Sequence, residues 1–582
     1  MGIAGRMFYL QIIKGDYYAA LARGQHTEYI ERDPPRGNIF FEDKFAASAP
    51  ETDTMKSGPA TAGQDGLFVA ATNKEWPLLY AVPREITDAR AVASQLAPLL
   101  YRALSSSYND ELDSEDAVSQ LEESVYQRLG NKEDSYEPLA HKLEKEIAEE
   151  IEALDLEGIY TAKELLRYYP AKELGARMLG FVGYEENERV GQYGVEGFYE
   201  DFLRGTKGVS EIPLLSFRGE RKELTRPGDD LLLSIDYNIQ FMLEEKLKDV
   251  KEKFEAEGAS AIVMDPKTGE LIAIAQADSF DPNRYWQVET LDIFLNDAVQ
   301  KMFEPGSVMK PFTMAAALDQ GLLSPTTEYT DKGYVRVGAY TIKNSDEKTY
   351  GRKTMTNVLE FSINTGAVFV EQLVGHDIFR EYLGRFGFGI WTEIDLQGEV
   401  PGDIQNILLT SRDINFATAS FGQGIAVTPI QLLAGFAAFA NGGDIMKPHV
   451  VNEIVSASGA RTVVEPVVTG SPITPKTAAQ ITSMLVSVVE HGYGKKAAVK
   501  GYKVAAKTGT AQVPNEEGGG YSEDKTIHSL VGFAPAYNPR FIALIKVDNP
   551  QGVDFASESI APLFSEIAEY ILHYYEIPPD AE

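Results

Sequence analysis

The sequence predicts an α+β fold with more than one domain, in which the larger domain has a sheet with helices against its faces. Three observations predict this fold. The chain has 582 residues, which is more than one hydrophobic core usually organises. Strand patterns lie at residues 231–275 and again at 502–547. The long stretch between them has helical patterns, so both ends of this domain should enter one sheet.

The first 225 residues lack a strong alternation of strands and helices, which indicates an accessory region. Within it, Glu42–Asp65 is rich in Ala, Ser, Thr, Pro, Gly and acids, a composition that predicts an exposed loop. In Tyr136–Leu154, apolar residues recur every three or four positions among Glu and Lys, which predicts an amphipathic helix with a solvated charged face. Its apolar positions are Leu139, Leu143, Ile147, Ile151 and Leu154.

The pattern changes at Arg226–Asp230, where a strand at Leu231–Ile235 and a helix at Tyr237–Glu257 are predicted. We therefore expect a domain boundary here. The expected organisation is an accessory domain at 1–225 with a polar insertion near 42–66, a larger domain at 226–576 and a tail at 577–582.

The predicted sheet begins with a hairpin. Two apolar strands flank Asp265–Gly269, whose composition favours a tight turn. These strands are Ala259–Met264 and Glu270–Ala275. Strand patterns return near the C-terminus, at Tyr502–Val513, His528–Pro535 and Phe541–Val547. We found no internal repeat.

The composition excludes several function classes. Lys and Arg number 54 against 87 Asp and Glu, and the net charge of −33 repels phosphate backbones, so nucleic acid is not expected as a partner. The absence of cysteine excludes thiolate catalysis and is compatible with an oxidising extracytoplasmic compartment. The HExxH, P-loop and GxSxG patterns are missing.

Neither a metal nor a cofactor is expected. The seven histidines show no ligand spacing, so we interpret them as structural or surface residues. They are His26, His141, His376, His449, His491, His528 and His573.

Three short patterns carry the chemistry, and each also has a chance match elsewhere. They are Ser307-Val-Met-Lys310, Ser362-Ile-Asn364 and Lys507-Thr-Gly509, against Ser522–Lys525, Ser107–Asn109 and Lys267–Gly269. Local context separates the two sets. Ser307 stands where a helix begins, whereas Ser522 lies in a polar, Gly-rich stretch and Lys267 in the predicted hairpin turn.

The spacing of Ser307 and Lys310 predicts a nucleophile and its base. Three residues place the amine one helical turn on, on the same face as the hydroxyl. Serine needs a neighbouring base, and lysine can be that base only if burial or a nearby cation keeps part of it neutral. Pro311 is tolerable only in the first turn, which supports a helix that starts here.

Lys507 lies in an alternating segment that predicts a strand. Without a side chain at Gly509, a peptide could lie against this strand, while Lys507, Thr508 and Thr510 offer donors to a carboxylate. The N–H groups of Ser307 and Thr510 could form an oxyanion hole.

Ser362 and Asn364 could both face one cleft from a loop or a strand, where the hydroxyl can relay a proton and the amide can hold a peptide carbonyl. The alternative for this motif alone is a loop that caps a helix near Gly366.

Taken together, the order SxxK, SxN and KTG within one mixed domain is that of active-site serine penicillin-recognising enzymes. The chain resembles the class B penicillin-binding proteins, which are monofunctional D,D-transpeptidases with an N-terminal pedestal. Further segments resemble this family on both sides of the boundary. They are Arg32–Ile39, Tyr168–Pro170, Leu179–Gly183, Gly194–Gly197, Asn296–Val299, Phe421–Gly424, Thr428–Gln431, Asn441–Gly443 and His528–Pro535.

The resemblance implies a transpeptidase domain with a central antiparallel sheet, helices on both faces and a helical subdomain, after an elongated mixed α/β pedestal. It implies that Ser307 is the nucleophile, Lys310 the base and Ser362 a proton relay. Asn364 would contact the substrate. Lys507, Thr508 and Thr510 would bind its terminal carboxylate, and Gly509 would let the substrate lie against the same strand.

The implied partners are stem peptides ending in D-Ala-D-Ala, β-lactams, a membrane-embedded SEDS-type glycan polymerase and other divisome proteins. Gln25, Phe421–Gly424 and Val547–Pro550 favour the cell-division subgroup over the elongation subgroup. The family's membrane anchor is not in the sequence, and we expect it just before residue 1, with the body of the protein on the extracytoplasmic side. The segment after the RGxI motif departs from the family pattern at Phe40–Lys44.

Three alternatives stay open from the sequence. An elongation-type class B enzyme has the same motifs. A β-lactamase would need a deacylating base, which Glu393 resembles faintly, but it has no use for a long pedestal. A β-lactam sensor or a non-catalytic septal scaffold is the alternative of another class.

Overall fold

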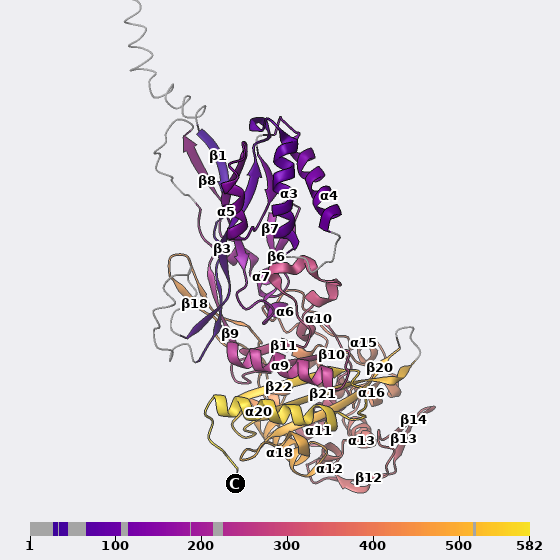
Figure 1. Cartoon of the computed structure of the whole chain (residues 1–582). Coiled ribbons are helices and arrows are strands. Elements are labelled where there is room, and N and C mark those ends of the chain that lie inside the picture. The colour runs from indigo at the N-terminus through magenta and orange to yellow at the C-terminus, as the bar shows by residue number, and fades with distance from the viewer. Residues whose placement is uncertain are drawn as a thin grey trace, which may run out of the picture. The chain divides into compact units, whose positions relative to one another are not determined.

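The computed structural model describes residues 27–32, 34–44, 66–105, 114–134, 136–186, 188–213, 225–515 and 520–581. By compactness the chain separates into a smaller unit, residues 71–170, and a larger unit formed by residues 1–70 and 171–582 (Figure 1). The domain boundary expected at 226 stays a prediction. Most of the polar insertion and the Ser107–Asn109 match lie outside the described residues.

The smaller unit is a three-stranded antiparallel sheet with helices on it. Strand β3 pairs with both β4 and β5, and it begins in the larger unit. Its core is formed by side chains of β3, α3, α4 and α5, among them Leu79, Leu96, Leu129 and Ile147. Its elements are β3 (Leu67–Ala81), η4 (Pro83–Glu85), α3 (Ala89–Ser105), α4 (Ser114–Leu129), β4 (Glu137–Ala140), α5 (Lys145–Ala153) and β5 (Ile159–Tyr168).

The helix predicted for Tyr136–Leu154 is wrong in its first half. Residues Glu137–Ala140 form β4, and the helix α5 starts only at Lys145. Leu139, Leu143 and Ile147 nevertheless face the same core, from a strand, a connection and a helix in turn. The regular spacing of apolar residues therefore reflects a common core rather than a continuous helix.

In the larger unit, the segments that flank the smaller unit in sequence come together. Strand β1 pairs with β8, and β2 runs parallel to β9. Arg36 forms ion pairs with Glu196 at 2.7 Å and Glu200 at 2.6 Å, which joins two segments singled out in the sequence. The elements are β1 (Thr27–Arg32), β2 (Ile39–Glu42), α6 (Ala176–Leu179), β6 (Phe181–Glu185), β7 (Glu188–Gln192), α7 (Gly194–Phe198), α8 (Glu200–Leu203), β8 (Gly208–Pro213) and β9 (Asp230–Asp236).

The centre of the larger unit is a five-stranded antiparallel sheet in the order β11-β10-β22-β21-β20. Its strands come from the beginning and from the end of the segment 258–548, as the sequence predicted. They are β10 (Gly258–Met264), β11 (Leu271–Gln276), β20 (Ala505–Pro514), β21 (Tyr521–Ala534) and β22 (Phe541–Asp548). Strand β20 is at the edge, so its outer backbone groups are not used within this sheet.

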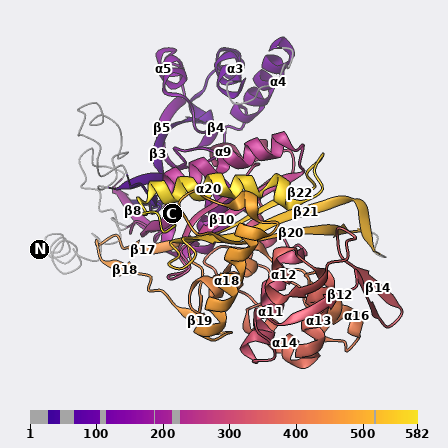
Figure 2. The ribbon, with the colours of Figure 1, turned by 90° about the horizontal axis from the view of Figure 1, so that it is seen from below.

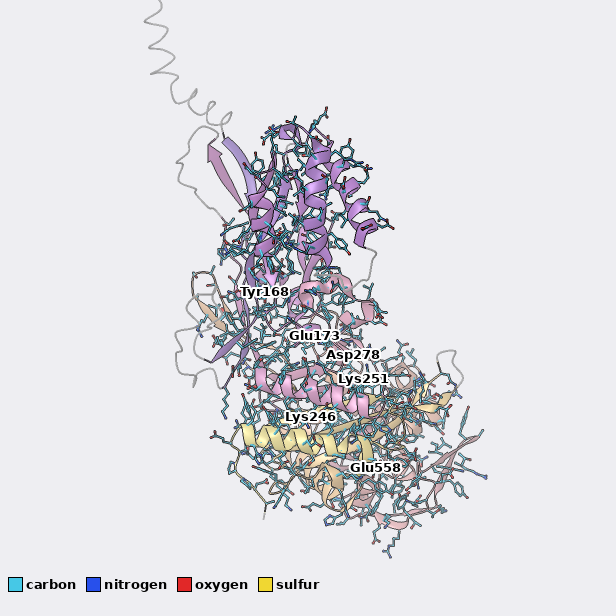
Figure 3. All side chains as sticks on the ribbon, viewed as in Figure 1. Tyr168, Glu173, Lys246, Lys251, Asp278 and Glu558 are labelled. Atoms are coloured by element: carbon cyan, nitrogen blue, oxygen red, sulfur yellow. The ribbon has the colours of Figure 1, made fainter. Side chains whose placement is uncertain are left out.

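Helices cover both faces of this sheet (Figure 2). On one face, apolar residues of β10 and β22 pack with α9 (Tyr237–Lys253) and α20 (Ala561–Tyr574) in one core. On the other face, Phe533 of β21 packs against Phe436 of α17 (Pro429–Ala440). Lys251 of α9 also pairs with Asp278 at 2.6 Å, just after β11 (Figure 3).

The block between the hairpin and β20 is mainly helical, as expected, and is built around Phe312. Its ring contacts those of Phe386, Phe388, Phe436 and Phe439. The further helices of the unit are η5 (Pro282–Gln287), η6 (Leu291–Phe294), α10 (Asp297–Gln300), η7 (Gly306–Met309), α11 (Lys310–Asp319), α12 (Met355–Glu360), α13 (Asn364–Val374), α14 (His376–Arg385), α15 (Gln405–Leu408), α16 (Asp413–Ala419), α18 (Pro475–His491), η8 (Lys495–Ala497) and α19 (Ala556–Ser559).

Several short strands lie within and after this helical block, and some of them extend the sheet that contains β9. Strands β17 and β18 continue from β9, and three small two-stranded sheets are β12 with β15, β13 with β14 and β16 with β19. Their bounds are β12 (Glu328–Asp331), β13 (Tyr334–Val337), β14 (Tyr340–Lys343), β15 (Gly351–Thr354), β16 (Ile445–Met446), β17 (Val451–Val455), β18 (Arg461–Val463) and β19 (Val468–Gly470). Within the described ranges, no helix is both long enough and apolar enough to cross a bilayer.

Candidate active site

Ser307 lies in the tight turn η7, directly before α11. The sequence predicted a helix that starts at this serine, and the α-helix starts one turn later, at Lys310, with Pro311 in its first turn. The serine is half-buried, and no hydrogen bond of its hydroxyl occurs among the residues that the structure describes. The hydroxyl is therefore open to a reacting group.

Lys310 is 1% exposed, and its ammonium group points to the Ser362–Asn364 segment. It donates to the carbonyl oxygen of Ser362, to Ser362 Oγ at 3.1 Å and to Asn364 Oδ1 at 2.8 Å. Burial lowers its pKa well below the usual value, the charge of Lys507 lowers the pKa further, and Asp346 opposes the change. The condition that the sequence set for a lysine base is therefore met.

Ser362 occupies the connection between α12 and α13, with φ of 53°, a left-handed conformation that is strained for serine. Ser362 does not cap the following helix. The N-cap position is occupied by Ile363, and no side chain forms a capping hydrogen bond there. Asn364 is the first residue of α13, and its Nδ2 donates to the carbonyl oxygen of Lys343 at 3.0 Å. The helix-cap interpretation of this motif does not describe the structure.

Lys507 extends from β20 toward Ser362. Its Nζ donates to Ser362 Oγ at 3.1 Å and to the Thr508 carbonyl oxygen at 2.7 Å, and its residue is 1% exposed. Burial lowers the pKa of Lys507 to about 7. Two lysines from distant segments thus share one hydroxyl, and the charge of Lys507 favours the neutral form of Lys310.

The Ser307 turn lies directly beside β20. A Cβ built on Gly306 would be 3.2 Å from Ala511 Cβ and 3.4 Å from the Thr510 carbonyl oxygen. The turn and the strand therefore meet at the positions whose N–H groups were predicted to form an oxyanion hole, those of Ser307 and Thr510.

Strand alternation places Lys507 and Gly509 on one face of β20 and Thr508 and Thr510 on the other. The hydroxyl of Thr510 accepts from the backbone N–H of Ala556 at 3.1 Å, so its own proton remains to be donated. Because β20 is an edge strand, a peptide along its free edge can reach groups of both faces.

Gly509 is packed closely against the turn before Ser307. A Cβ at this position would lie 2.8 Å from the Pro305 carbonyl oxygen and 2.6 Å from Ser529 Oγ. The missing side chain thus lets β20 approach the turn before Ser307, and the substrate-binding role expected from the sequence stays a prediction. The two chance matches within the described residues lie outside this site. Lys267–Gly269 is in the β10–β11 connection, and Ser522 and Lys525 are in β21.

Replacing Gly509 by Ala is expected to slow acylation of the protein by a penicillin about 10-fold to 100-fold, because the added methyl group would displace Pro305 and hence Ser307. The unfolding free energy should fall by about 1–3 kcal/mol from overpacking. Gly384→Ala is the control, since its Cβ would meet no atom within 4 Å. A wild-type acylation rate in the Gly509 variant would contradict the role given to this contact.

Several supporting residues carried no sequence signal. Asp331 accepts from Thr365 Oγ1 at 2.7 Å and from Asn344 Nδ2 at 3.0 Å, directly behind the Asn364 helix start. Asp346 accepts bonds from the hydroxyls of Tyr350 and Tyr493, and its charge acts on Lys310. Apart from Tyr350, four residues after Asp346, these partners are distant in the chain, so no local motif indicated them.

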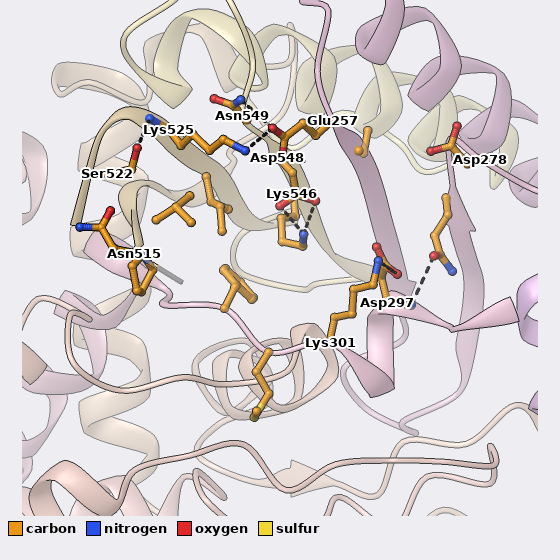
Figure 4. Close-up of a pocket in the computed structure, with 18 of the residues that line it drawn as sticks. Glu257, Asp278, Asp297, Lys301, Asn515, Ser522, Lys525, Lys546, Asp548 and Asn549 are labelled. Carbon is orange, nitrogen blue, oxygen red and sulfur yellow. Dashed lines mark hydrogen bonds and ion pairs between the residues drawn. The ribbon is translucent and has the colours of Figure 1, made fainter. Parts of the chain in front are cut away.

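A separate cavity of about 700 Å³ lies on the five-stranded sheet, and none of the predicted site residues lines it (Figure 4). It carries ion pairs of Lys525 with Glu257 at 2.6 Å and of Lys546 with Asp548 at 2.5 Å. Since its cations already have acidic partners, we do not place the reaction there. In the described part of the chain, no cluster of three or more His, Cys, Asp or Glu side chains could hold a metal ion.

Glu393, the residue that resembled a deacylating base, lies elsewhere in the larger unit. Its side chain is 73% exposed and pairs with Lys447 at 3.2 Å. Neither Lys310, Ser362 nor Lys507 has a hydrogen bond to it. The geometry gives no support to the β-lactamase alternative.

Comparison with known proteins agrees with the motifs. Residues 259–569 match the family model of the penicillin-binding protein transpeptidase domain, and residues 64–233 match that of the penicillin-binding protein dimerisation domain. Stage V sporulation protein D of Bacillus subtilis is 32% identical over 97% of this chain and 82% of that protein. The probable peptidoglycan D,D-transpeptidase PenA of Neisseria meningitidis is 28% identical over 98% of this chain and 93% of its own length.

A solved structure gives the same result. Penicillin-binding protein 3 from Mycobacterium tuberculosis, crystallised in complex with aztreonam, superposes with a TM-score of 0.64 at 31% identity, covering 72% of this chain and 92% of that one. The fold predicted from the sequence, a transpeptidase domain after a mixed N-terminal domain, is confirmed. The chain therefore belongs to the penicillin-binding protein transpeptidase family, as a class B member with a dimerisation domain, and is a peptidoglycan D,D-transpeptidase.

Proposed function

We propose that the protein cross-links the stem peptides of septal peptidoglycan through an acyl-enzyme at Ser307, and that β-lactams acylate the same serine. The observation that carries this proposal is the shared hydrogen bonding of Lys310 and Lys507 to Ser362 Oγ, with Lys310 one helical turn after Ser307. The three motifs, separated in the chain, thus supply one hydroxyl nucleophile, one buried amine and one cation to the same place.

In the acylation step, Ser307 Oγ attacks the carbonyl carbon between the two terminal D-alanines. Neutral Lys310 takes the serine proton, and the N–H groups of Ser307 and Thr510 receive the negative charge of the tetrahedral intermediate. The C–N bond then breaks. Ser362, which accepts from both lysines, passes the proton to the leaving amine, so D-alanine departs as a neutral amine and Ser307 carries an ester.

In the second step, an amino group of a neighbouring stem peptide attacks the ester carbonyl. Lys310 accepts the proton of this amine and returns it to Ser307 Oγ as the ester bond breaks, which restores the enzyme and forms the cross-link. Asn364 Oδ1 accepts a hydrogen bond from Lys310, and Asn364 Nδ2 donates to the Lys343 carbonyl oxygen. Asn364 therefore fixes the direction of the Lys310 amine.

Recognition of the substrate carboxylate falls to β20 in this proposal. With a pKa of about 7, Lys507 is only partly protonated at neutral pH, and a bound carboxylate would favour its charged form. A charged Lys507 in turn keeps Lys310 neutral, because like charges oppose each other. Substrate binding would thus prepare the base.

Replacing Lys507 by Ala is expected to lower the second-order rate constant of acylation about 10-fold to 150-fold, the value of one lost charge-assisted bond of about 1.5–3 kcal/mol. Since the charge of Lys507 lowers the pKa of Lys310, its removal should also shift the rise of the acylation rate to higher pH. Rates with a fluorescent penicillin between pH 6 and 10 measure both effects. Lys507→Arg, which keeps the charge, should retain the position of the pH rise, and an unshifted profile in the Ala variant would contradict the coupling.

We further propose a role in cell division, at a septal site on the extracytoplasmic side of a bacterial membrane, with a SEDS-type glycan polymerase and other divisome proteins as partners. Relatives named Stage V sporulation protein D and peptidoglycan D,D-transpeptidase FtsI homolog support the division role, and the partners and location follow from the family resemblance alone. Depletion in the native organism distinguishes the subgroups, because filaments without septa are expected here and round cells for an elongation enzyme.

The experiment that tests the activity combines two assays on the same preparation. A transpeptidase should be labelled by a fluorescent penicillin, and it should release one D-alanine for each cross-link formed from a pentapeptide and an acceptor amine. Labelling without any cross-link would favour a β-lactam sensor, and fast turnover of penicillin without a lasting adduct would favour a β-lactamase.

A further inference from the structure

Glu304 lies three residues before Ser307 and has no part in the reaction steps above. The residue is 9% exposed. Its Oε1 accepts from the backbone N–H of Gly424 at 2.9 Å and from the hydroxyl of Tyr521 at 3.2 Å. Its Oε2 is buried and bonds to no described residue. Burial raises its pKa to about 7, which is a cost to folding at neutral pH, so stability alone does not account for this carboxyl.

The first partner, Gly424, belongs to a loop that lies against the Ser307 turn. The N–H of Gly306 donates to the carbonyl oxygen of Gly422 at 3.1 Å, and a Cβ on Gly422 would be only 2.2 Å from Gly306 O. Phe303 and Val427 exchange backbone bonds at 2.9 and 3.0 Å. The bond from Gly424 to Glu304 lies between these two contacts and closes the loop on the turn.

The second partner, Tyr521, is the first residue of β21 and stands opposite Pro514, the last residue of β20. Further along β20, Thr510 and Ala511 lie against Gly306. The tyrosine hydroxyl therefore ties the outer part of the β20–β21 hairpin to the same turn. One carboxyl group holds the loop and the hairpin on either side of the segment that ends at Ser307.

We propose that Glu304 is a positioning residue of the transpeptidation site, which fixes the Ser307 turn relative to β20 through Gly424 and Tyr521. This inference rests on the proposed function, because it assumes that Ser307 is the acylated residue. Glu304 does not touch the substrate. It acts on the distance between the nucleophile and the strand that holds the oxyanion and the carboxylate, where a displacement of about 1 Å can cost about 100-fold in rate.

The test separates binding of a penicillin from the acylation rate constant in Glu304→Gln, Glu304→Ala and Tyr521→Phe. Gln keeps the shape and the acceptor oxygen, so its acylation rate constant should stay close to that of the wild type. Ala should lower it about 10-fold to 100-fold with little change in binding. Tyr521→Phe removes one of the two bonds and should give a smaller loss in the same constant.

A matched control is Glu371→Ala. Glu371 of α13 is also a buried glutamate, its pKa is also raised to about 7, and both its oxygens are buried without a hydrogen bond to any described residue. It should change the melting temperature but not the acylation rate constant. All rates are measured well below the lowest melting temperature of the set.

Three outcomes would overturn the proposal: a wild-type rate constant in Glu304→Ala, an equal loss in Glu304→Gln, or an equal loss in Glu371→Ala. If the wild type forms no adduct at Ser307, the proposed function fails and this inference fails with it. If the wild type is acylated at Ser307 and the Glu304 variants behave like it, only the positioning role fails.

Discussion

Replacing Ser307 by Ala is expected to abolish covalent labelling of the protein by a fluorescent penicillin while leaving its thermal unfolding unchanged. The hydroxyl of Ser307 makes no hydrogen bond with any described residue, so its removal should cost little stability. Without this oxygen no ester can form, and the other groups of the site have no nucleophile to activate. Denaturing gels after labelling measure the adduct, and calorimetry measures the fold.

The matched control for this prediction is Ser522→Ala. Ser522-Glu-Asp-Lys525 fits the same SxxK template, but it lies in β21, where Ser522 accepts backbone bonds from Asp524 and Lys525. This variant should be labelled like the wild type. Retained labelling in Ser307→Ala, or its loss in Ser522→Ala alone, would place the nucleophile elsewhere.

Replacing Lys310 by Met is expected to lower the acylation rate about 100-fold to 10,000-fold, the usual contribution of a general base. Lys310→Arg should be equally slow, because a guanidinium keeps its proton and cannot accept that of Ser307. In the wild type, the acylation rate should rise with pH as Lys310 loses its proton, and the rise should begin below the usual lysine range, because burial and Lys507 lower its pKa.

Replacing Lys310 by Met should also change how the stability of the protein depends on pH. The pKa of Lys310 is lower in the folded than in the unfolded state, so the unfolded state binds the extra proton and the wild type loses stability as pH falls below the unfolded value of 10.5. Met carries no such cost. The melting temperature of Lys310→Met relative to the wild type should therefore be higher at pH 6 than at pH 10. A difference that is constant with pH would contradict the depressed pKa.

The features that the sequence predicts well are those with a local cause. Pro311 marked a helix start, and α11 begins at Lys310, one turn after the predicted position. The hairpin of β10 and β11 followed from a turn composition between two apolar strands.

The features that were missed depend on contacts between distant residues. Strand β21 starts at Tyr521 rather than at the predicted His528, because its first residues are largely polar, are not buried and pair with the outer part of β20. Glu304 contacts Gly424 and Tyr521, which are 120 and 217 positions away in the chain. The close approach of Gly509 to Pro305 has the same origin, since a single sequence does not reveal which backbone atoms a glycine will face.

We propose that the SxxK, SxN and KTG segments form one site with Ser307 as its acylated residue. Mass spectrometry of the intact protein after treatment with a penicillin, followed by mapping of the modified peptide, tests it most directly. We expect a single adduct with the mass of one penicillin on the peptide that contains Ser307. An adduct on a peptide that contains another serine, or an unmodified protein after prolonged treatment, would contradict it.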